Sequence, residues 1–376
     1  MALKVTEVDG RRGTAHFVDL PWRILPGQGS LWIPPLRMAV RDALDTRRNP
    51  FYRNAERALF VAERDGRPTG RIAAIENRAH NRHHDDRVGF FGFFDCANDP
   101  AAAEALLQRA GQWLRERGLT AARGPVSPSM NHESGLLVDG FETPPAIMTP
   151  WNPPYYADLM DAAGFEGVQD LLGYDVTAHG TNTIPDRVRR LAERTARSTG
   201  ITFRTLEPRM LEQEAKRVLD LYCDAWQGNW GFVPPDWKEF WHTAKDLKSV
   251  VVPDFSYVAE MQGEIVGFML LARDVNEVLR TVPSGRLWPT TVFKLLRGLP
   301  RVRRGRIILL GLRGEYRHRG LFPLFIYEAA RRARATGFEG AEASWILDGN
   351  EALTAPLTAM GLEPYKRWRI YEKALD

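Results

Sequence analysis

Cysteine is scarce in this chain. The 376 residues include two, Cys96 and Cys223, which lie far apart and have no neighbours at metal-ligand spacing. This excludes a disulfide-stapled scaffold and a cysteine-ligated zinc module. The simplest interpretation is a protein of a reducing compartment.

Long apolar runs are also missing. No stretch approaches the ~20 consecutive apolar residues that a membrane-spanning helix needs, and the first residues lack the basic-then-apolar pattern of a secretion signal. Charged residues make up 26% of the chain and apolar residues 44%, which is typical of a globular protein. We therefore expect a cytoplasmic protein with room for two domains.

Acidic residues are absent from residues 280–306, although this segment holds eight basic side chains. The whole chain has a formal net charge of +4, so its basicity is concentrated here, which argues against a general nucleic-acid surface. Apolar residues alternate with the cations: Leu287, Trp288, Val292, Phe293, Leu295, Leu296 and Leu299. This mixture suits an element that lies on the anionic inner face of a membrane. Two other interpretations stay open: an insertion packed on its own domain with a solvated rim, and a salt-sensitive nucleic-acid site.

A strand, a basic turn and a helix follow one another between Arg306 and Gly337. The run Arg306–Leu312 is short and apolar, as in a buried strand. A helix is predicted after the turn, with Pro323 in its first turn, Gly337 after its last, and an apolar face made by Phe322, Phe325, Ile326, Ala329, Ala330 and Ala333. The N–H groups and dipole of a helix N-terminus attract anions, so we predict that a phosphate or pyrophosphate binds at the turn.

The chain also contains an internal repeat. Val61-Ala62-Glu63, Gly66 and Gly70 recur, each 197 positions later, as Val258-Ala259-Glu260, Gly263 and Gly267. The copies differ by insertions near residues 125–150 in the first and 275–306 in the second. One fold is therefore used twice. We predict an α/β fold with a mixed (α+β) sheet, divided into domains 1–180 and 181–376.

The second copy resembles the Gcn5-related N-acetyltransferases (the GNAT family). In that family a strand leads into Arg/Gln-x-x-Gly-x-Gly/Ala and a helix, and here the corresponding residues read Arg317-His318-Arg319-Gly320-Leu321-Phe322. The likeness continues through Ala341–Leu347 to Asn350. Over nearly its full length the chain is similar to bacterial tandem GNAT proteins, including relatives of the ceramide-forming acyltransferases. The resemblance implies two GNAT-like domains, an acyl-CoA co-substrate and no metal.

Two residues of the second copy depart from the GNAT pattern. Phe322 stands where a small residue normally faces the pyrophosphate, and Leu357 stands where a tyrosine often protonates the leaving thiolate. The first copy departs further, because its strand-to-helix turn has no glycine or arginine and carries Asp95 and Asp99, which would repel a pyrophosphate. We expect the first copy to be non-catalytic.

The resemblance assigns a CoA site to the second copy. Backbone N–H groups of Gly311, Leu312 and Arg313 would hold the thioester carbonyl. The turn residues would face the pyrophosphate: Arg317, His318, Arg319, Gly320, Leu321 and Phe322. Asn350 completes the predicted cofactor-binding set.

A base for the amine proton is predicted in the first-copy insertion. Asn131-His132-Glu133 is a polar cluster in a proline-rich, otherwise apolar stretch, and an imidazole pKa of about 6.5 suits the task. We expect this loop to reach the strand end at Leu312. Satisfaction of loop backbone groups is the alternative role for the cluster. Three other carboxylates are rival candidates: Glu315, Glu342 and Asp348, of which Glu342 shares a strand face with Ser344.

A second histidine cluster is predicted to have no metal. His80, His83 and His84 adjoin Asp85 and Asp86, but the neighbouring cations Arg78, Arg82 and Arg87 would repel a metal ion. We expect a solvated hairpin loop there.

We therefore predict an acyl-CoA-dependent N-acyltransferase that acts on a primary amine. The basic segment favours a membrane-resident acceptor such as a long-chain sphingoid-type amine, whose acylation gives a ceramide, with a long acyl chain on the Phe322 side of the turn. Two alternatives stay open. One is a non-catalytic acyl-CoA-binding protein, suggested by Phe322 and Leu357, and the other is a small-molecule N-acetyltransferase.

Overall fold

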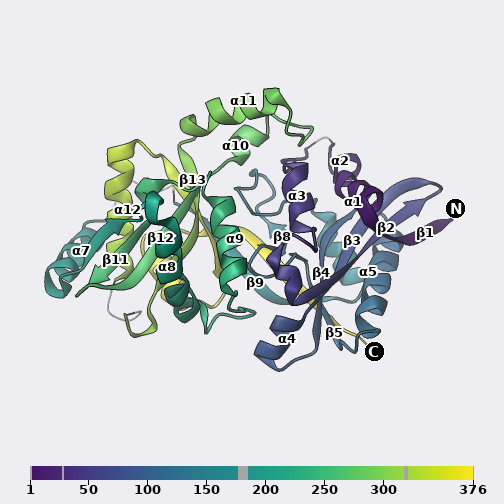
Figure 1. Cartoon of the computed structure of the whole chain (residues 1–376), viewed down its shortest axis with the longest axis horizontal. Helices are drawn as coiled ribbons and strands as arrows, with labels where there is room; N and C mark the ends of the chain where they lie inside the picture. The colour runs from purple at the N-terminus through teal and green to yellow at the C-terminus, as the bar shows by residue number, and fades with distance from the viewer. Residues whose placement is uncertain (1, 28, 177–184, 317–320, 376) are drawn as a thin grey trace. The chain divides into compact units, whose positions relative to one another are not determined.

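The computed structural model describes residues 2–27, 29–176, 185–316 and 321–375 (Figure 1). The chain forms two compact units. The first contains residues 1–171, 278–296 and 366–376, and the second contains residues 172–277 and 297–365. The expected boundary between residues 180 and 181 falls in 177–184, outside the described residues.

A mixed sheet forms the centre of the first unit. Its order is β1-β2-β3-β4-β5-β15. The bounds are β1 Leu3–Val8, β2 Ala55–Arg64, β3 Arg67–Asn77, β4 Val88–Cys96, β5 Ala121–Gly124 and β15 Pro364–Ala374. Neighbours are antiparallel except β4 and β5, and β15 brings Tyr371 opposite Gly124. Helix α5 (Pro100–Arg115) buries Leu106, Leu107 and Leu114 against the sheet.

The remaining elements of the first unit surround this sheet. They are α1 Gly10–Asp19, α2 Pro21–Ile24, α3 Arg37–Ala43, η1 Pro50–Arg53, α4 Arg78–His84, β6 Val126–Ser127, β7 Glu133–Ser134, β8 Leu136–Asp139 and α6 Tyr155–Ala162. The histidine segment expected as a solvated loop is helix α4, whose cap Asn77 accepts from the Ala79 and His80 N–H groups. His80 is 1% exposed and packs on Phe90, so the expectation of a solvated loop was wrong.

The second unit has the same plan. Its sheet order is β14-β13-β12-β11-β10, antiparallel except for the β13–β14 pair. The strand bounds are β10 Thr202–Thr205, β11 Tyr257–Met261, β12 Glu264–Arg273, β13 Arg304–Leu312 and β14 Gly340–Leu347. Between the sheets in sequence, β9 Glu166–Asp175 contributes residues to both units.

Helices cover both faces of the second sheet. Their bounds are α7 Asp186–Thr199, α8 Leu211–Trp226, α9 Trp237–Leu247, α12 Phe322–Thr336 and α13 Glu351–Ala359. The predicted helix therefore begins at Phe322, and Gly337 ends it in the left-handed conformation. The insertion before β13 contains α10 Asn276–Leu279, α11 Pro289–Gly298 and η4 Leu299–Arg301, while η2 Pro208–Met210, η3 Pro253–Phe255 and η5 Gly314–Tyr316 are single turns.

The internal repeat is a repeat of structure. The β2–β3 register shifts between Ala62 and Glu63, and the β11–β12 register shifts between Ala259 and Glu260. Both hairpins also close through two residues of positive φ, Asp65-Gly66 and Gln262-Gly263, which is the geometry of a tight two-residue turn. The predicted mixed α/β fold with two copies of one plan is confirmed.

One repeated glycine lets a helix approach the sheet. A Cβ added to Gly70 would lie 2.7 Å from a methyl group of Leu106 on α5, and one added to Gly267 would lie 2.8 Å from the Phe325 ring on α12. Both distances are too short for real atoms, so glycine permits the close packing in each copy.

Among the described residues, no helix is long and apolar enough to cross a membrane.

Candidate functional site

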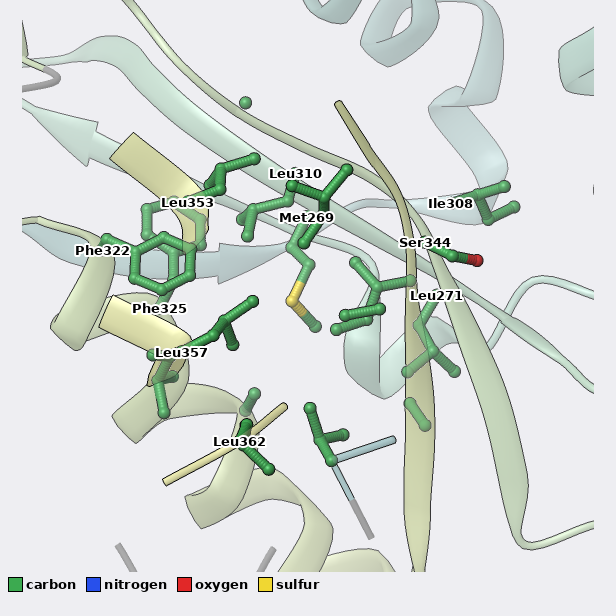
Figure 2. Close-up of a pocket in the computed structure, with 18 of the residues that line it drawn as sticks. Met269, Leu271, Ile308, Leu310, Phe322, Phe325, Ser344, Leu353, Leu357 and Leu362 are labelled. Atoms are coloured by element: carbon green, nitrogen blue, oxygen red, sulfur yellow. The ribbon is translucent and has the colours of Figure 1, made fainter. Parts of the chain in front are cut away.

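A cavity of about 310 Å³ lies inside the second unit, between the sheet and helices α12 and α13 (Figure 2). It exists because two strands separate. The parallel ladder of β13 and β14 runs from the Arg304–Gly340 pair to the Ile307–Ala343 pair. Beyond those pairs, residues of the two strands no longer pair with one another but line the cavity. Among them are Ile308, Leu310, Ser344 and Ile346.

A bulge in β13 marks the point of separation. Leu309 is opposite Leu270 and Ile307 is opposite Leu271, so Ile308 is an extra residue on β13. A bulge bends its strand and interrupts the ladder. The first copy has a bulge at the related place, because Gly92 and Asp95 on β4 are opposite Ala73 and Arg71.

The cavity lining is overwhelmingly apolar. Figure 2 shows Phe322, Phe325, Leu353 and Leu357 on one side of the cavity and Ser344 on the other. Phe322 is 9% exposed and Leu357 is 3% exposed, and both belong to one cluster with Ile346 and Leu362. The two departures from the GNAT pattern therefore line the same space.

A buried polar network reaches the cavity through one of its members, Ser344. Arg306 on β13 lies opposite Glu342 on β14, and both side chains are about 2% exposed. The Arg306 Nε donates to Ser344 Oγ at 2.8 Å, and the Ser344 hydroxyl donates to the Glu342 carboxylate at 2.5 Å. The Tyr365 hydroxyl also donates to Glu342.

Burial and the Glu342 charge act in the same direction on the Tyr365 phenol. Burial first, and then the Glu342 carboxylate, raises the pKa of Tyr365 above its usual range, so the phenol stays protonated. The Arg306 guanidinium lies 3.9 Å from Glu342, and its positive charge compensates the buried carboxylate. It also lies 4.5 Å from the Trp345 ring centroid, within the range of a cation–π contact. Ser344 is the member of the network that also lines the cavity.

The strand end predicted to hold a thioester adjoins the cavity. Gly311 and Leu312 line it, and Gly311 lets α8 pack closely, since an added Cβ would lie 2.5 Å from the Trp226 ring. The Arg313 N–H donates to the Val266 carbonyl at 3.0 Å. Backbone groups alternate along an antiparallel ladder, so the Leu312 N–H points to the opposite edge of β13.

Only part of the predicted pyrophosphate turn belongs to the residues that the structure describes. Arg317, His318, Arg319 and Gly320 lie outside the described residues. Leu321, which is buried, precedes α12, and no side-chain cap hydrogen bond is made there. Asn350 lines the cavity at the start of α13. Of the rival carboxylates, Glu315 and Asp348 are exposed.

The predicted base cluster lies in the first unit. Asn131 and His132 are half-buried and Glu133 is exposed. The His132 Nδ1 is 2.8 Å from Ser129 Oγ, and its ring meets Phe51 edge-on at 6.2 Å between centroids. These contacts hold the imidazole in a defined orientation, and its predicted role in catalysis stays a prediction.

The first copy fills the place that is hollow in the second. Its parallel β4–β5 ladder runs from the Val88–Ala121 pair to the Phe90–Arg123 pair. Next to it the chain itself enters: a Cβ on Gly92 would lie 1.5 Å from the Val126 carbonyl oxygen, and the Phe93 N–H donates to Ser127 Oγ at 2.9 Å.

The first copy also carries its own anions at the helix start. Asp99 accepts from the Ala102 N–H at 3.2 Å and pairs with Arg64 at 2.7 Å. The hydrogen bonds from Arg64 hold the pKa of Asp99 below its usual value. Asp95 pairs with Arg71 at 2.7 Å, yet burial raises the pKa of the Asp95 carboxyl.

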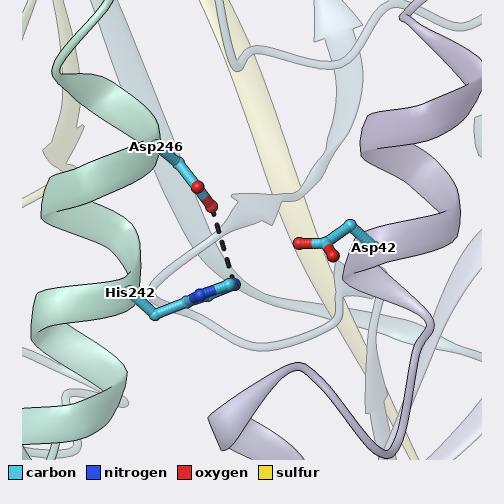
Figure 3. A group of neighbouring side chains, drawn as sticks. All are labelled: Asp42, His242 and Asp246. Carbon is cyan, nitrogen blue, oxygen red and sulfur yellow. Dashed lines mark ion pairs between the residues drawn. The ribbon is translucent and has the colours of Figure 1, made fainter.

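A pair of titratable side chains on α9 lies outside the cavity lining. On α9, His242 Nε2 is 3.6 Å from Asp246 Oδ2, one helical turn away (Figure 3). Such an i, i+4 pair is typical of a helix surface. The expectation that the reaction needs no metal stays a prediction.

Sequence reasoning missed Arg306, Ser344 and Tyr365 as members of a site. The period-2 spacing of Glu342 and Ser344 was a usable signal, because it places both on one strand face. The pairing of Arg306 with Glu342 has no local signal, since it depends on the register of β13 against β14.

Comparison with known proteins agrees with this architecture. No family model matches the sequence. The chain is 36% identical over 367 residues to a bacterial ceramide synthase of Caulobacter vibrioides, covering 96% of this chain and 94% of the relative. It is 32% identical over 365 residues to protein YghO of Escherichia coli, covering 96% and 92%.

A solved structure agrees with the tandem fold. The tandem GNAT protein from the clavulanic acid biosynthesis pathway superposes with a TM-score of 0.59 at 14% identity, covering 100% of this chain and 99% of that protein. The repeated plan, the separated β13–β14 pair and the full-length identity to relatives lead to one assignment. The chain belongs to the family of the bacterial ceramide synthase of Caulobacter vibrioides, and it is an acyltransferase with a tandem GNAT fold.

Proposed function

We propose that the second unit transfers an acyl group from a long-chain acyl-CoA to a primary amine and that its cavity holds the acyl chain. The single observation that carries the proposal is the apolar cavity of about 310 Å³ between the separated strands β13 and β14. Each methylene removed from water favours binding by about 0.8 kcal/mol. A long chain therefore gains far more from this space than an acetyl group does.

The departures Phe322 and Leu357 support the same substrate. Both are buried in the cluster that lines the cavity. A tyrosine at position 357 would bring a hydroxyl into an apolar wall, where an unpaired polar group is costly. Both substitutions therefore adapt the GNAT plan to a long acyl chain.

The expected binding site of the CoA moiety lies next to the cavity. The pyrophosphate binds at the turn containing Arg317, Arg319 and Gly320, before the α12 N-terminus. The Leu312 N–H donates to the thioester carbonyl, because the Arg313 N–H is engaged by Val266. This orientation directs the chain past Phe322 into the cavity.

The Ser344–Glu342 pair supplies a proton route. The Ser344 oxygen accepts from Arg306, the Ser344 hydroxyl donates to Glu342, and the residue lines the cavity. A hydroxyl oxygen has a second lone pair, which is free to accept a proton from the amine. The amine nitrogen attacks the thioester carbon, the carbon–sulfur bond breaks, and CoA leaves as the thiolate. The amine proton passes through Ser344 to Glu342 and then to solvent, and the thiolate takes a proton from solvent.

His132, with Asn131 and Glu133, is the alternative proton acceptor. The contact with Ser129 supports this assignment, since it fixes the ring as a base requires. Comparing the turnover of His132→Ala with that of Ser344→Ala distinguishes proton transfer to His132 from proton transfer through Ser344.

The acceptor is a long-chain amine of the sphingoid type. The support comes from a relative at 36% identity over 96% of the chain that bears the name of a ceramide synthase. Acylation of such an amine by an acyl-CoA would give a ceramide.

Titration calorimetry with CoA, acetyl-CoA and palmitoyl-CoA tests the proposal. We expect palmitoyl-CoA to bind at least about 100-fold more tightly than CoA. Leu357→Trp should weaken palmitoyl-CoA binding and spare acetyl-CoA. The same exchange outside the cavity lining, Leu219→Trp on α8, is the matched control.

Each outcome has a separate meaning. No affinity for any of the three ligands overturns the proposal. Equal affinity for acetyl-CoA and palmitoyl-CoA indicates a small-molecule N-acetyltransferase. Tight palmitoyl-CoA binding without turnover on long-chain or short amines indicates an acyl-CoA-binding protein that lacks catalysis.

A further inference from the structure

Helix α11 presents an unusual outward surface. The helix and the two residues before it expose five large apolar side chains: Leu287 (45% exposed), Trp288 (53%), Val292 (38%), Phe293 (54%) and Leu296 (70%). Among the described residues, eight large hydrophobic side chains are exposed, and these five all lie within residues 287–296. We call these five residues the α11 face; the helix is labelled in Figure 1.

The helix turns its apolar face away from the protein. Trp288, Val292 and Leu296 are spaced four residues apart, so they form one line along the helix. The buried line lies beside it: Thr291 is 4% exposed and Leu295 is half-buried. An ordinary surface helix has the reverse arrangement, with its apolar stripe towards the core.

The segment before α11 is firmly held. The Trp22 indole donates to the Pro283 carbonyl at 2.9 Å, and the Arg37 side chain donates to the Ser284 carbonyl at 2.8 Å. Gly285 has φ +60° and lies so close to Trp22 that an added Cβ would be 2.4 Å from the ring. The turn that precedes the α11 face is therefore fixed by hydrogen bonds and close packing.

Cations accompany the α11 face and acids are absent. Lys294 and Arg297 are exposed on the helix, and Arg286 and Arg301 are exposed on either side of it. Residues 280–306 contain no aspartate or glutamate. Apolar and aromatic side chains together with cations on one helix match the composition of elements that lie in the interface of an anionic bilayer.

We propose that the α11 face docks the protein on an anionic lipid bilayer. Trp288, Val292 and Leu296 enter the interface, and the neighbouring cations lie near lipid phosphates. An acidic protein partner would fit the cations but leaves the line of apolar side chains unexplained. The purpose of docking rests on the proposed long-chain acceptor, which resides in such a surface, whereas the docking itself does not depend on catalysis.

Vesicle flotation of the full chain tests this proposal without any substrate. The probes are vesicles of phosphatidylglycerol mixed with an equal amount of phosphatidylcholine, and vesicles of phosphatidylcholine alone. We expect binding to the anionic vesicles at low salt and a clear fall at high salt. The double variant Val292→Ser, Leu296→Ser should lower the partition constant by about tenfold or more.

Two further variants complete the test. Lys294→Gln with Arg297→Gln should weaken binding to anionic vesicles by about tenfold and remove much of its salt dependence. The matched control, Val168→Ser with Met210→Ser, changes two apolar side chains that are also exposed and should bind as the parent does.

Three results would overturn the proposal. The first is that the parent chain does not bind anionic vesicles at low salt. The second is that the Val292→Ser, Leu296→Ser variant binds them as well as the parent does. The third is that the parent is a dimer that does not bind vesicles and the variant is a monomer. The last would identify the α11 face as a contact between two copies. Palmitoyl-CoA affinity measured on the same variant should be unchanged, which separates this test from that of the proposed function.

Discussion

The two copies of the fold differ at the start of the helix that follows the strand-to-helix turn, α5 in the first copy and α12 in the second. In the first copy, α5 begins at Asp99, whose carboxylate caps the helix and pairs with Arg64. In the second copy, α12 begins after Leu321, where no side-chain cap hydrogen bond is made. A helix start attracts an anion in either case. The first copy supplies that anion from its own chain. In the second copy, under the function proposed above, the pyrophosphate of CoA takes this position.

The same contrast holds where the parallel strands end. In the first copy the backbone near Val126 fills the space beside β4, and Ser127 accepts from the Phe93 N–H. In the second copy the corresponding separation of β13 and β14 leaves the apolar cavity. Under the proposed function, one fold thus serves as a structural support in the first copy, whose own residues occupy the opening, and as a binding site in the second copy, where the opening is a cavity.

Giving the second copy an anion like that of the first should have the largest effect. Gly320→Asp would place a carboxylate in the predicted pyrophosphate turn, and repulsion between charges about 4 Å apart at a protein surface is worth about 4 kcal/mol. We expect CoA affinity to fall by roughly 100- to 1,000-fold in titration calorimetry. Gly320→Ala is the uncharged control. Normal CoA binding by Gly320→Asp would mean that the anion site lies elsewhere.

Removing the Ser344 hydroxyl from the cavity lining should lower turnover and leave acyl-CoA binding unchanged. Ser344→Ala interrupts the route to Glu342, and loss of a positioned proton acceptor typically costs about 100-fold or more in rate. We expect kcat to fall by about that factor while palmitoyl-CoA affinity stays within about twofold. His132→Ala is measured in parallel. A larger loss in His132→Ala than in Ser344→Ala would assign the proton to the first-copy loop.

Removing the anion of the first copy should affect stability alone. Asp99→Ala deletes a helix cap, which typically stabilises by about 1 kcal/mol, and it also removes the pairing with Arg64. Urea unfolding should report this loss, and CoA affinity should be unchanged. A lowered CoA affinity in folded Asp99→Ala would show that the first copy takes part in binding. Because the pKa of Asp99 is depressed in the folded state, its contribution is present above pH ~4 and is lost as the pH falls further.

The smallest expected effect is an acid sensitivity of the first unit. Burial lowers the pKa of His80 to about 4. An unfolded chain takes up a proton on this histidine near pH 6.5, whereas the folded chain resists it, so stability falls as the pH drops from about 6.5 towards 4. Between pH 7 and 5.5 we expect a loss of about 1 kcal/mol. His80→Gln should flatten this dependence and the exposed control His83→Gln should not; an equal slope in both would contradict the assignment.

The sequence predicted the parts of the fold that depend on local patterns. The helix from Phe322 to Thr336 follows from its apolar spacing and from Gly337, and the repeated hairpins follow from Gly66 and Gly263. The first strand, β1, was not predicted, because six residues without clean periodicity become a strand through pairing with β2.

The site could be predicted only in part. Gly311, Leu312, Phe322 and Asn350 were named from the sequence, and all four line the cavity. The cavity itself depends on where β13 and β14 stop pairing, and the Arg306–Glu342 contact depends on their register. Neither property is local, so neither is written in the spacing of residues along the chain.

Photoaffinity labelling tests the central claim most directly. An acyl-CoA that carries a diazirine at the end of a long chain would be bound, irradiated and located by peptide mass spectrometry. We expect the label on cavity residues of the second copy, such as Phe322, Phe325, Leu357 and Leu362, and competition by palmitoyl-CoA. Specific labelling of the first copy instead, or labelling that palmitoyl-CoA does not prevent, would contradict the account.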